Sequence, residues 1–540
     1  MNGFFRIQEP KNEKVMDYKK GSEEREKLSN AINKIKSGKI EIPLIIDGKE
    51  VYTENKVNVI APHEKSSKLA VCNRATESEI KDAIEASMKA KKEWEKFSWE
   101  ERVSIFLKAA ELLATKYRYI VNAATMLGQS KTIHQAEIDS AAEMIDFLRF
   151  NAYFMKRIYE EQPLSSVSEI NMLDYRPLDG FVFAITPFNF TSIGGNLPSS
   201  PAMMGNTVIW KPASTAVLSN YYLMKIFIEA GLPAGVINFL PGRGSEIGKY
   251  VINDKNLNGI HFTGSTGTFN HIYKQVADNL DKYKSYPRIV GETGGKDFVF
   301  VHESADIHKV AVALVRGAFE YQGQKCSAAS RAYIPESLYD DIMKHVKKYL
   351  DDIKMGNPEN FENFVSAVID ENAYEDIKSY IDHAKKSKKA EIIAGGNCDK
   401  SRGFFIEPTV IKAKQYDYKT MKEEIFGPVL TVYRYKNKDY EKTLDLCNEI
   451  SPYGLTGAIF AQDRNAVRQA DKKLRFAAGN FYINDKPTGA VVGRQPFGGA
   501  RKSGTNDKAG SILNLIRWTN PRNISESFNA PENYRYPYMD

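Results

Sequence analysis

The chain has 540 residues, enough for two or three domains of about 150 residues each. Hydrophobic residues make up 42% of it and charged residues 26%, so it can bury a large core and is not a disordered chain. The formal charge of +7 is the small difference between 75 basic and 68 acidic residues, which does not favour a nucleic-acid or membrane-surface partner.

The cysteines and the N-terminus bear on the cellular compartment. Cys72, Cys326, Cys398 and Cys447 are far apart and form no CxxC pair, so we predict no disulfide framework, no metal site and a reducing compartment. The first twenty residues lack the long apolar core of a secretory signal, and they carry acids with little Arg or Ser, unlike a transit peptide. No window approaches the roughly 20 apolar residues of a membrane helix. We therefore expect a cytoplasmic enzyme, with the mitochondrial matrix open for a eukaryotic source.

Helices are predicted before the first buried strand. Residues 11–38 are rich in Lys and Glu, which predicts a solvated N-terminal helix. Apolar residues recur at helical spacing over residues 80–88 and again over 103–110. A third helix is predicted from about residue 134 to 159. We expect these helices to form one block.

From Gly180 onward, short runs rich in β-branched and aromatic residues alternate with helical windows. A helix is predicted over residues 216–230, because Gly231 and Pro233 are typical of a helix end. Alternating strands and helices predict an α/β fold with doubly wound parallel sheets. The predicted strands are 181–185, 207–210, 236–240, 259–263, 298–301, 409–411, 429–433 and 457–460.

Two glycine-containing turns follow predicted strands and open predicted helices. Residues 242–248 read GRGSEIG, which has GxGxxxG spacing instead of GxGxxG, and no acid follows at the expected distance. Residues 263–268 read TGSTGT, whose small side chains let backbone amides approach a phosphate at a helix N-terminus. Either turn taken alone is more often structural.

Two polar residues in unusual surroundings are candidates for chemistry. Cys326 lies in the segment QKCSA, whose small or polar neighbours favour access and a helix-start position that stabilises a thiolate, although most cysteines are buried hydrophobes. Glu292 stands between glycines after a β-rich run. Such an acid is usually on the surface, whereas a glycine-walled pocket would raise its pKa towards that of a general base.

Further motifs follow other predicted strands. Residues 186–190 read TPFNF, in which the Asn189 amide could cap a helix or point at a developing oxyanion. WKP occupies 210–212, EEIFGP occupies 423–428 and PFGG occupies 496–499. Each motif has an ordinary reading as a turn or an apolar contact. Their joint occurrence in this order is hard to explain in that way.

The set resembles the aldehyde dehydrogenase superfamily. TPFN, WKP, FTGS, the Glu-x-Gly-Gly-Lys box, GQKC, EEIFGP and PFGG appear in family order over residues 186–499. Segments 189–196, 324–330 and 489–508 are similar to the Δ1-pyrroline-5-carboxylate dehydrogenase branch. That branch oxidises L-glutamate γ-semialdehyde to L-glutamate in proline catabolism, through a thiohemiacetal and a thioester on the cysteine.

The resemblance also implies a domain organisation and partners. It implies a Rossmann-type NAD-binding domain over residues 1–162 and 179–291, with an α/β catalytic domain over residues 292–515. Residues 163–178 and 516–540 would form a small β-hairpin oligomerisation element. A homodimer or higher homo-oligomer is expected, with a proline dehydrogenase as a candidate partner.

Site residues are assigned by the same resemblance. Cys326 would be the nucleophile, Asn189 an oxyanion donor and Glu292 the base that activates water. NAD would be held by Thr186, Lys211, Ser214, Gly264, Ser265, Thr266, Gly267, Thr268, Glu424 and Phe426. The substrate would be held by Glu143, Phe190, Ser327, Gly489, Ala490 and Phe497.

Two of these assignments leave alternatives. Ser214 stands where many relatives carry an acid for the adenosine 2′-hydroxyl, so NADP use stays open. Glu143 is equally consistent with an ordinary acid on a helix surface.

Other functions are weighed against this one. Another small polar semialdehyde is the alternative within the class. A CoA-acylating dehydrogenase would need no base such as Glu292. A cysteine hydrolase would usually use a histidine base, and none of the eight histidines lies in an obvious catalytic motif. Cys326, Glu292 and Asn189 together disfavour a non-catalytic protein.

Overall fold

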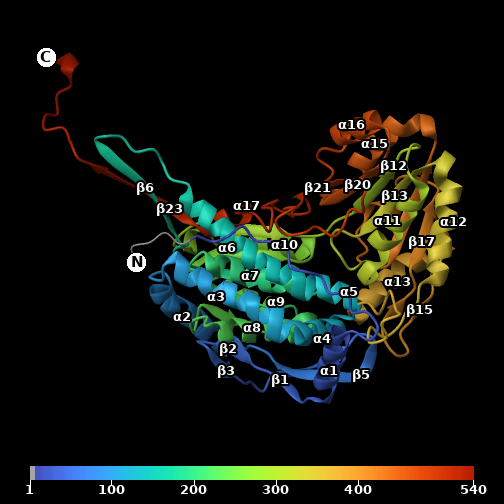
Figure 1. The fold of residues 1–540 in the computed structure, drawn as a ribbon, viewed down its shortest axis with the longest axis horizontal. Coiled ribbons are helices and arrows are strands. Elements are labelled where there is room, and N and C mark those ends of the chain that lie inside the picture. Colours follow the sequence, from blue (N-terminus) through green and yellow to red (C-terminus); the bar gives the residue numbers. More distant parts are fainter. Residues whose placement is uncertain (1–5, 540) are drawn as a thin grey trace.

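The structure is a computed structural model that describes residues 6–539. The predicted NAD-binding domain begins at residue 1 and the predicted oligomerisation element ends at residue 540, so residues 1–5 and 540 of these two predictions lie outside the described residues. Two seven-stranded sheets organise the chain, one in each half of the molecule (Figure 1). The chain passes from the first sheet to the second between residues 292 and 297. This crossing places the motifs of both halves next to one another.

The first sheet has five parallel strands and two antiparallel strands at one edge. Its parallel strands are largely buried, which explains their nearly continuous apolar runs. The strand order reverses direction at β7, because β8 lies on one side of it and β10 on the other. In order, the strands are β11 (Arg288–Glu292), β10 (Leu257–Thr263), β7 (Phe181–Ile185), β8 (Thr207–Lys211), β9 (Ile237–Phe239), β2 (Leu44–Ile46) and β3 (Lys49–Val51).

The second sheet is also parallel except for one edge strand, β14. In order, its strands are β14 (Ala390–Ala394), β17 (Thr409–Ala413), β18 (Val429–Tyr435), β13 (Ala329–Pro335), β12 (Asp297–Val301), β20 (Thr456–Phe460) and β21 (Asn480–Ile483). Smaller sheets join β1 (Ile40–Ile42), β5 (Glu64–Asn73) and β4 (Lys56–Ala61), then β15 (Cys398–Asp399) with β16 (Phe405–Ile406), and β19 (Tyr453–Gly454) with β22 (Ala500–Arg501).

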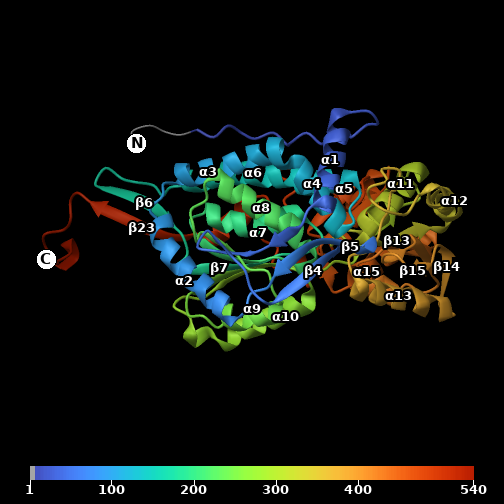
Figure 2. The ribbon, with the colours of Figure 1, turned by 90° about the horizontal axis from the view of Figure 1, so that it is seen from below.

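Helices cover both faces of each sheet (Figure 2). Around the first sheet lie α1 (Glu23–Ser37), α2 (Glu77–Trp94), α3 (Trp99–Leu112), α4 (Arg118–Gln129), α5 (Ile133–Ala136), α6 (Met144–Glu160), α7 (Thr191–Met203), α8 (Val217–Ala230), α9 (Gly244–Val251) and α10 (Thr266–Asp278). Around the second lie α11 (Ile307–Phe319), α12 (Glu336–Asp352), α13 (Glu371–Lys386), α14 (Lys419–Lys422), α15 (Tyr440–Glu449) and α16 (Arg464–Lys473), while α17 (Ile512–Leu515) packs on α6.

The predicted helices and strands of the middle of the chain are present, with ends shifted by a few residues. Helix α8 is ended by Gly231, which has φ +101°. The helix predicted from 134 to 159 contains a π-helical segment, Glu137–Glu143, between α5 and α6. Such segments often occur at functional sites.

The prediction for residues 11–38 is wrong in two respects. The helix begins only at Glu23, and residues 6–18 have no regular secondary structure. The helix is not solvated all round, because Leu28 and Ile32 are buried against the body of the protein. The many lysines and glutamates conceal this narrow apolar stripe.

Two segments far apart in sequence form a projecting ribbon. Strand β6 (Glu169–Arg176) pairs antiparallel with β23 (Asn520–Ser527), and the ribbon stands away from both sheets (Figure 1). Across residues 6–539, no helix is long and apolar enough to cross a membrane.

Candidate active site

A cavity of about 410 Å³ lies where the chain crosses between the two sheets. Cys326 and Glu292 both line it, although they reach it from different elements. Glu292 is the last residue of β11, and Cys326 lies in the loop between a short 3₁₀ turn and β13. The predicted substrate residues Glu143, Phe190, Ser327, Gly489, Ala490 and Phe497 line the same cavity.

Cys326 does not start a helix, so the predicted helix-start stabilisation of a thiolate is wrong. The turn Glu320–Gly323 precedes the cysteine, and a strand follows it. Burial raises the pKa of the Cys326 thiol well above its usual range, and the nearby carboxyls of Asp297 and Glu292 raise it further. The resting side chain is therefore a thiol, and its proton must be taken up when the sulfur reacts.

Glu292 has the surroundings expected of a base. Its Oε2 is buried and has no hydrogen-bond partner within residues 6–539. Burial raises the pKa of Glu292 well above its usual range, while the Lys508 ammonium partly opposes this rise. Gly498 leaves the space beside the carboxylate, because a Cβ there would lie 2.9 Å from Oε1. A carboxyl with a raised pKa and a free oxygen can accept a proton in this cavity.

Asn189 does not cap a helix. The amides at the N-terminus of α7 are bound by Asp139, which accepts from Thr191 N at 3.0 Å and Ser192 N at 2.9 Å. The Asn189 side chain instead donates from Nδ2 to the Gln324 carbonyl oxygen at 3.1 Å. This bond holds the amide group beside the loop that carries Cys326, and Nδ2 keeps a second hydrogen to donate.

The Asn189→Ala variant tests the oxyanion assignment. We expect kcat to fall by on the order of 10²–10³, because one preorganised oxyanion donor is typically worth that much. NAD binding should be nearly unchanged. Steady-state kinetics and a fluorescence titration of NAD measure the two quantities, and a wild-type rate in the variant would contradict the assignment.

The far side of the cavity offers polar groups beside two phenylalanine rings. The Ser327 Oγ lies 2.8 Å from Thr488 Oγ1, which fixes the hydroxyl. Gly489 has φ +97°, a backbone conformation that favours glycine. Within the described chain, the amides of Gly489 and Ala490 donate to no protein acceptor. Two free N–H groups at a turn suit an anionic group of a ligand.

Glu143 lies in this cavity and not on the outer surface of its helix. Its Oε2 is 2.7 Å from Ser192 Oγ, which is also 2.8 Å from Asp139 Oδ1. A hydroxyl has one proton, so one of these contacts requires a proton from a carboxyl. Burial raises the pKa of Glu143 to about 8, with the Asp139 charge adding to the rise. The proton therefore belongs to Glu143, while Asp139 pairs with the buried Lys131 ammonium at 2.7 Å.

A pH series tests the protonation of Glu143. Its pKa rises from 4.5 when solvated to about 8 in the folded protein, so its contribution to stability is complete below pH 4.5 and is lost as the pH rises to 8. Glu143→Gln removes this loss. We expect the Tm of the variant, relative to wild type, to increase from about pH 5 to about pH 8.5 in thermal denaturation. The exposed control Glu54→Gln should show no such trend, and a flat difference for Glu143→Gln would contradict the protonated state.

The predicted cofactor residues gather at the carboxyl edge of the first sheet. Thr186 follows β7, Lys211 ends β8, and residues 264–268 follow β10 and begin α10. This is the edge where the strand order reverses, and ligands of open α/β sheets bind in the crevice at such a point. The Gly264 N–H donates to the Glu292 carbonyl oxygen at 3.1 Å, which joins this turn to the end of β11.

The residues at this edge fit a dinucleotide. The Lys211 ammonium has no acidic partner within residues 6–539, and burial lowers its pKa to about 8. Its Nζ lies 4.0 Å from where a Cβ of Gly244, the first residue of α9, would be. A free cation beside the N-terminus of a helix suits hydroxyl and phosphate groups. Most of the other predicted residues are open to a ligand: Ser214, Ser265, Gly267 and Thr268 are exposed, while Gly264 and Thr266 are half-buried. Thr186 is instead buried, and its Oγ1 accepts from Trp210 Nε1 at 3.2 Å.

Glu424 and Phe426 border a second hollow on the other side of Cys326. Glu424 Oε1 accepts from the Gly295 N–H at 2.8 Å, and burial raises its pKa to about 7. Phe426 has φ +55° and lies edge-on to Phe188, with ring centres 5.8 Å apart. Cys326 thus lies between the substrate cavity and the residues predicted to hold the nicotinamide end of NAD.

Sequence reasoning missed the residues that support the predicted ones. Lys131, Asp139 and Ser192 form the polar chain behind Glu143. The Lys486 ammonium lies beside the free amides, 3.2 Å from where a Cβ of Gly489 would be. These residues stand in no recognisable motif. The gathering of acids at positions 137, 139, 143 and 146 of one predicted helix was a signal that could have pointed to them.

The chain is similar to known proteins along nearly its whole length. The model described as the aldehyde dehydrogenase family matches residues 50–524. The chain is 55% identical over 536 residues to the Dictyostelium discoideum protein named mitochondrial Delta-1-pyrroline-5-carboxylate dehydrogenase, covering 99% of this chain and 96% of that one. Its structure is similar to the Delta-pyrroline-5-carboxylate dehydrogenase of Mycobacterium tuberculosis bound with NAD, with a TM-score of 0.97, 48% identity and complete coverage of both chains.

The fold is also similar to that of a solved protein with lower sequence identity. The proline utilization A protein (PutA) of Bdellovibrio bacteriovorus matches with a TM-score of 0.91 and 31% identity, over 97% of this chain and 54% of that one. The family match over residues 50–524 and the identity along nearly the whole chain establish the assignment. The chain belongs to the aldehyde dehydrogenase family.

Proposed function

We propose that the protein catalyses the NAD-dependent oxidation of L-glutamate γ-semialdehyde to L-glutamate, the reaction of proline catabolism expected from its sequence. The observation that carries this proposal is the cavity that joins a thiol and a buried base to a turn with free backbone amides. The proposal is supported by the sequence identity of 55% and 48% to two proteins named as pyrroline-5-carboxylate dehydrogenases.

The chain supplies a nucleophile, a base and an oxyanion donor. The Cys326 thiol loses its proton to solvent and its sulfur attacks the aldehyde carbon, which gives the alkoxide of a thiohemiacetal and leaves the Glu292 carboxylate free for the later step. Its oxyanion accepts hydrogen bonds from the Asn189 side-chain amide and the Cys326 N–H. After oxidation to the thioester, Glu292 activates a water molecule that releases the carboxylic acid and restores the thiol.

NAD, when bound, accepts the hydride that the tetrahedral carbon on Cys326 loses. The carboxyl edge of the first sheet would hold its phosphates through residues 264–268 and Lys211, with Glu424 on the nicotinamide ribose. Ser214 has no negative charge that would repel the 2′-phosphate of NADP. We therefore expect the enzyme to use NADP, but less efficiently than NAD.

The substrate headgroup would lie at the far end of the cavity. A desolvated carboxylate needs several hydrogen bonds, and Ser327 with the amides of Gly489 and Ala490 can provide them. The nearby Lys486 adds positive charge. Phe190 and Phe497 suit the short methylene chain between this headgroup and the aldehyde.

A panel of aldehydes measured with NAD and NADP tests the proposal. We expect kcat/KM for glutamate γ-semialdehyde to exceed that for hexanal by about 10⁴, since a site built to pair polar groups discriminates strongly against analogues that lack them. L-Glutamate should inhibit in competition with the aldehyde. Comparable values for hexanal would contradict the substrate while leaving the dehydrogenase activity standing, and a preference for another polar semialdehyde would favour that alternative.

Assembly and location extend the proposal. The ribbon of β6 and β23 would join two copies, because it exposes apolar residues such as Ile170 and Met172.

A proline dehydrogenase is the proposed partner enzyme, which the name of the PutA relative, proline utilization A, supports. The expected compartment is the cytoplasm, or the mitochondrial matrix as in the name of the Dictyostelium relative. Size-exclusion chromatography with light scattering tests whether two copies associate.

A further inference from the structure

The N-terminal segment 12–18, here termed the N-terminal strap, reaches the substrate cavity from the other end of the chain. It runs along the outside of α6 towards α1 (Figure 2). Asn12 Nδ2 donates to Asp146 Oδ2 on α6 and to the Val492 carbonyl oxygen, both at 2.8 Å. Its Oδ1 accepts from Arg494 Nε at 2.9 Å. The Asn12 side chain therefore ties α6 to a loop that lies 480 residues beyond Asn12 in the sequence.

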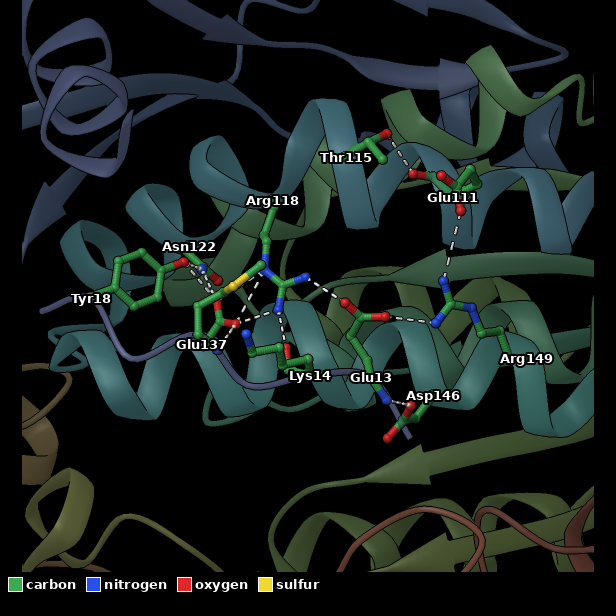
Figure 3. Close-up of polar contacts among 11 residues, drawn as sticks. Glu13, Lys14, Tyr18, Glu111, Thr115, Arg118, Asn122, Glu137, Asp146 and Arg149 are labelled. Atoms are coloured by element: carbon green, nitrogen blue, oxygen red, sulfur yellow. Dashed lines mark hydrogen bonds and ion pairs between the residues drawn. The ribbon is translucent and has the colours of Figure 1, made fainter. Parts of the chain in front are cut away.

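The strap is itself held by charged groups in the body of the protein (Figure 3). The Glu13 N–H donates to Asp146 Oδ1 at 2.7 Å, and its carboxylate pairs with Arg118 and Arg149, both at 2.7 Å. The Arg118 side chain is 1% exposed. Because these ion pairs are largely removed from water, they hold Glu13 firmly and so fix the backbone next to Asn12.

A second anchor lies towards the C-terminal end of the strap. The fully buried Glu137 accepts from the Met16 N–H at 2.9 Å and the Tyr18 hydroxyl at 2.8 Å, and it pairs with Arg118 (Figure 3). Glu137 begins the π-helical segment that ends at Glu143. The strap thus spans the same stretch of helix that forms one wall of the cavity.

The loop bound by Asn12 contains the free amides. Residues 489–494 begin with Gly489 and Ala490 at the cavity, while Val492 packs on Phe147 and Phe150 of α6. Gly493 has φ +80° and approaches the Phe150 ring closely, so the loop folds onto the helix at this point. Asn12 supplies the polar half of this attachment, because it binds the Val492 carbonyl and the Arg494 side chain.

We propose that Asn12 is a positioning residue that holds the loop 489–494 so that the amides of Gly489 and Ala490 converge on the carboxylate of the substrate. This rests on the proposed function, which places the carboxylate at those amides. Asn12 itself acts through the loop. Its removal should therefore weaken the binding of ligands that carry the carboxylate and leave other ligands unaffected.

The Asn12→Ala variant of the full chain tests the proposal. We expect KM for glutamate γ-semialdehyde and the inhibition constant of L-glutamate to rise in parallel by about tenfold, which corresponds to the loss of one or two ordinary hydrogen bonds. The kcat should change less than about twofold, since Cys326, Glu292 and Asn189 are untouched. KM for propanal, which has no carboxylate, and the Kd of NAD should stay at their wild-type values.

Three further variants separate positioning from general stability. Lys14→Ala removes an exposed side chain near Asn12 and keeps the backbone bond to Arg118, so it should behave as wild type. Tyr18→Phe removes a distant anchor and should lower the Tm without raising KM. Arg494→Ala removes one of the Asn12 contacts and should raise KM for the semialdehyde, but less than Asn12→Ala, which provides a second test if the latter folds poorly.

Three results would overturn the inference. Equal increases in KM for propanal and the semialdehyde, or the same increase in Tyr18→Phe as in Asn12→Ala, would make the strap a general stabilising element. Wild-type constants in a folded Asn12→Ala variant would show that Asn12 does not position the loop. Failure of the proposed function is distinguishable, because it would appear in the wild-type enzyme as the lack of a preference for carboxylate-bearing aldehydes.

Discussion

Replacing Cys326 with alanine should abolish aldehyde oxidation, with kcat falling by on the order of 10⁶, as expected when a covalent nucleophile is lost. Cys326 is the thiol that lies between the substrate cavity and the hollow bordered by Glu424 and Phe426. Without it, the aldehyde forms no tetrahedral alkoxide, and an aldehyde alone is a poor hydride donor. Spectrophotometric assay of NADH formation measures the loss.

The cofactor side should be unaffected by this change. Thr186, Lys211 and residues 264–268 lie at the carboxyl edge of the first sheet, away from the sulfur, so the Kd of NAD should stay close to that of wild type. Cys398→Ala is the matched control, since Cys398 is also half-buried but lies on β15 and lines neither the substrate cavity nor the hollow beside Glu424. Substantial turnover in a homogeneous Cys326→Ala preparation would refute the assignment.

Glu292→Gln is expected to slow deacylation, by on the order of 10²–10⁴, which is the usual contribution of a general base. The variant should release a burst of NADH of about one equivalent per active site and then turn over slowly, because the thioester forms faster than water can remove it. Stopped-flow measurement of NADH and mass spectrometry of the acylated protein detect both stages. A variant with neither a burst nor a thioester would show that Glu292 acts before acylation or only in the structure.

The pH profile gives an independent test of the same residue. Burial raises the pKa of Glu292, and a base must be deprotonated to act, so deacylation in the wild type should increase with pH above the ordinary carboxyl range. The Glu292→Gln variant should lose this limb of the profile. A wild-type profile that is already flat from about pH 5 would mean that the carboxyl ionises at its usual pKa.

Local sequence was enough to predict the alternation of strands and helices, because periodic apolar residues and stop signals such as Gly231 and Pro233 act over short distances. It was also enough to identify the family, because the motifs around Asn189, Glu292 and Cys326 each occupy a few consecutive residues. Their meeting in one cavity follows from the topology, since β11 ends the first sheet at Glu292 and the next strand begins the second sheet.

The state of the site and the course of the N-terminus depend instead on how distant segments pack. The side chain predicted as a thiolate at a helix start is a thiol in a loop, since its pKa depends on what surrounds Cys326 in space and not on its neighbours in sequence. Glu143 is a protonated acid for the same reason. Asn12 contacts Val492 across 480 residues, and no local pattern encodes such a pair, because its free energy arises only when distant segments fold together.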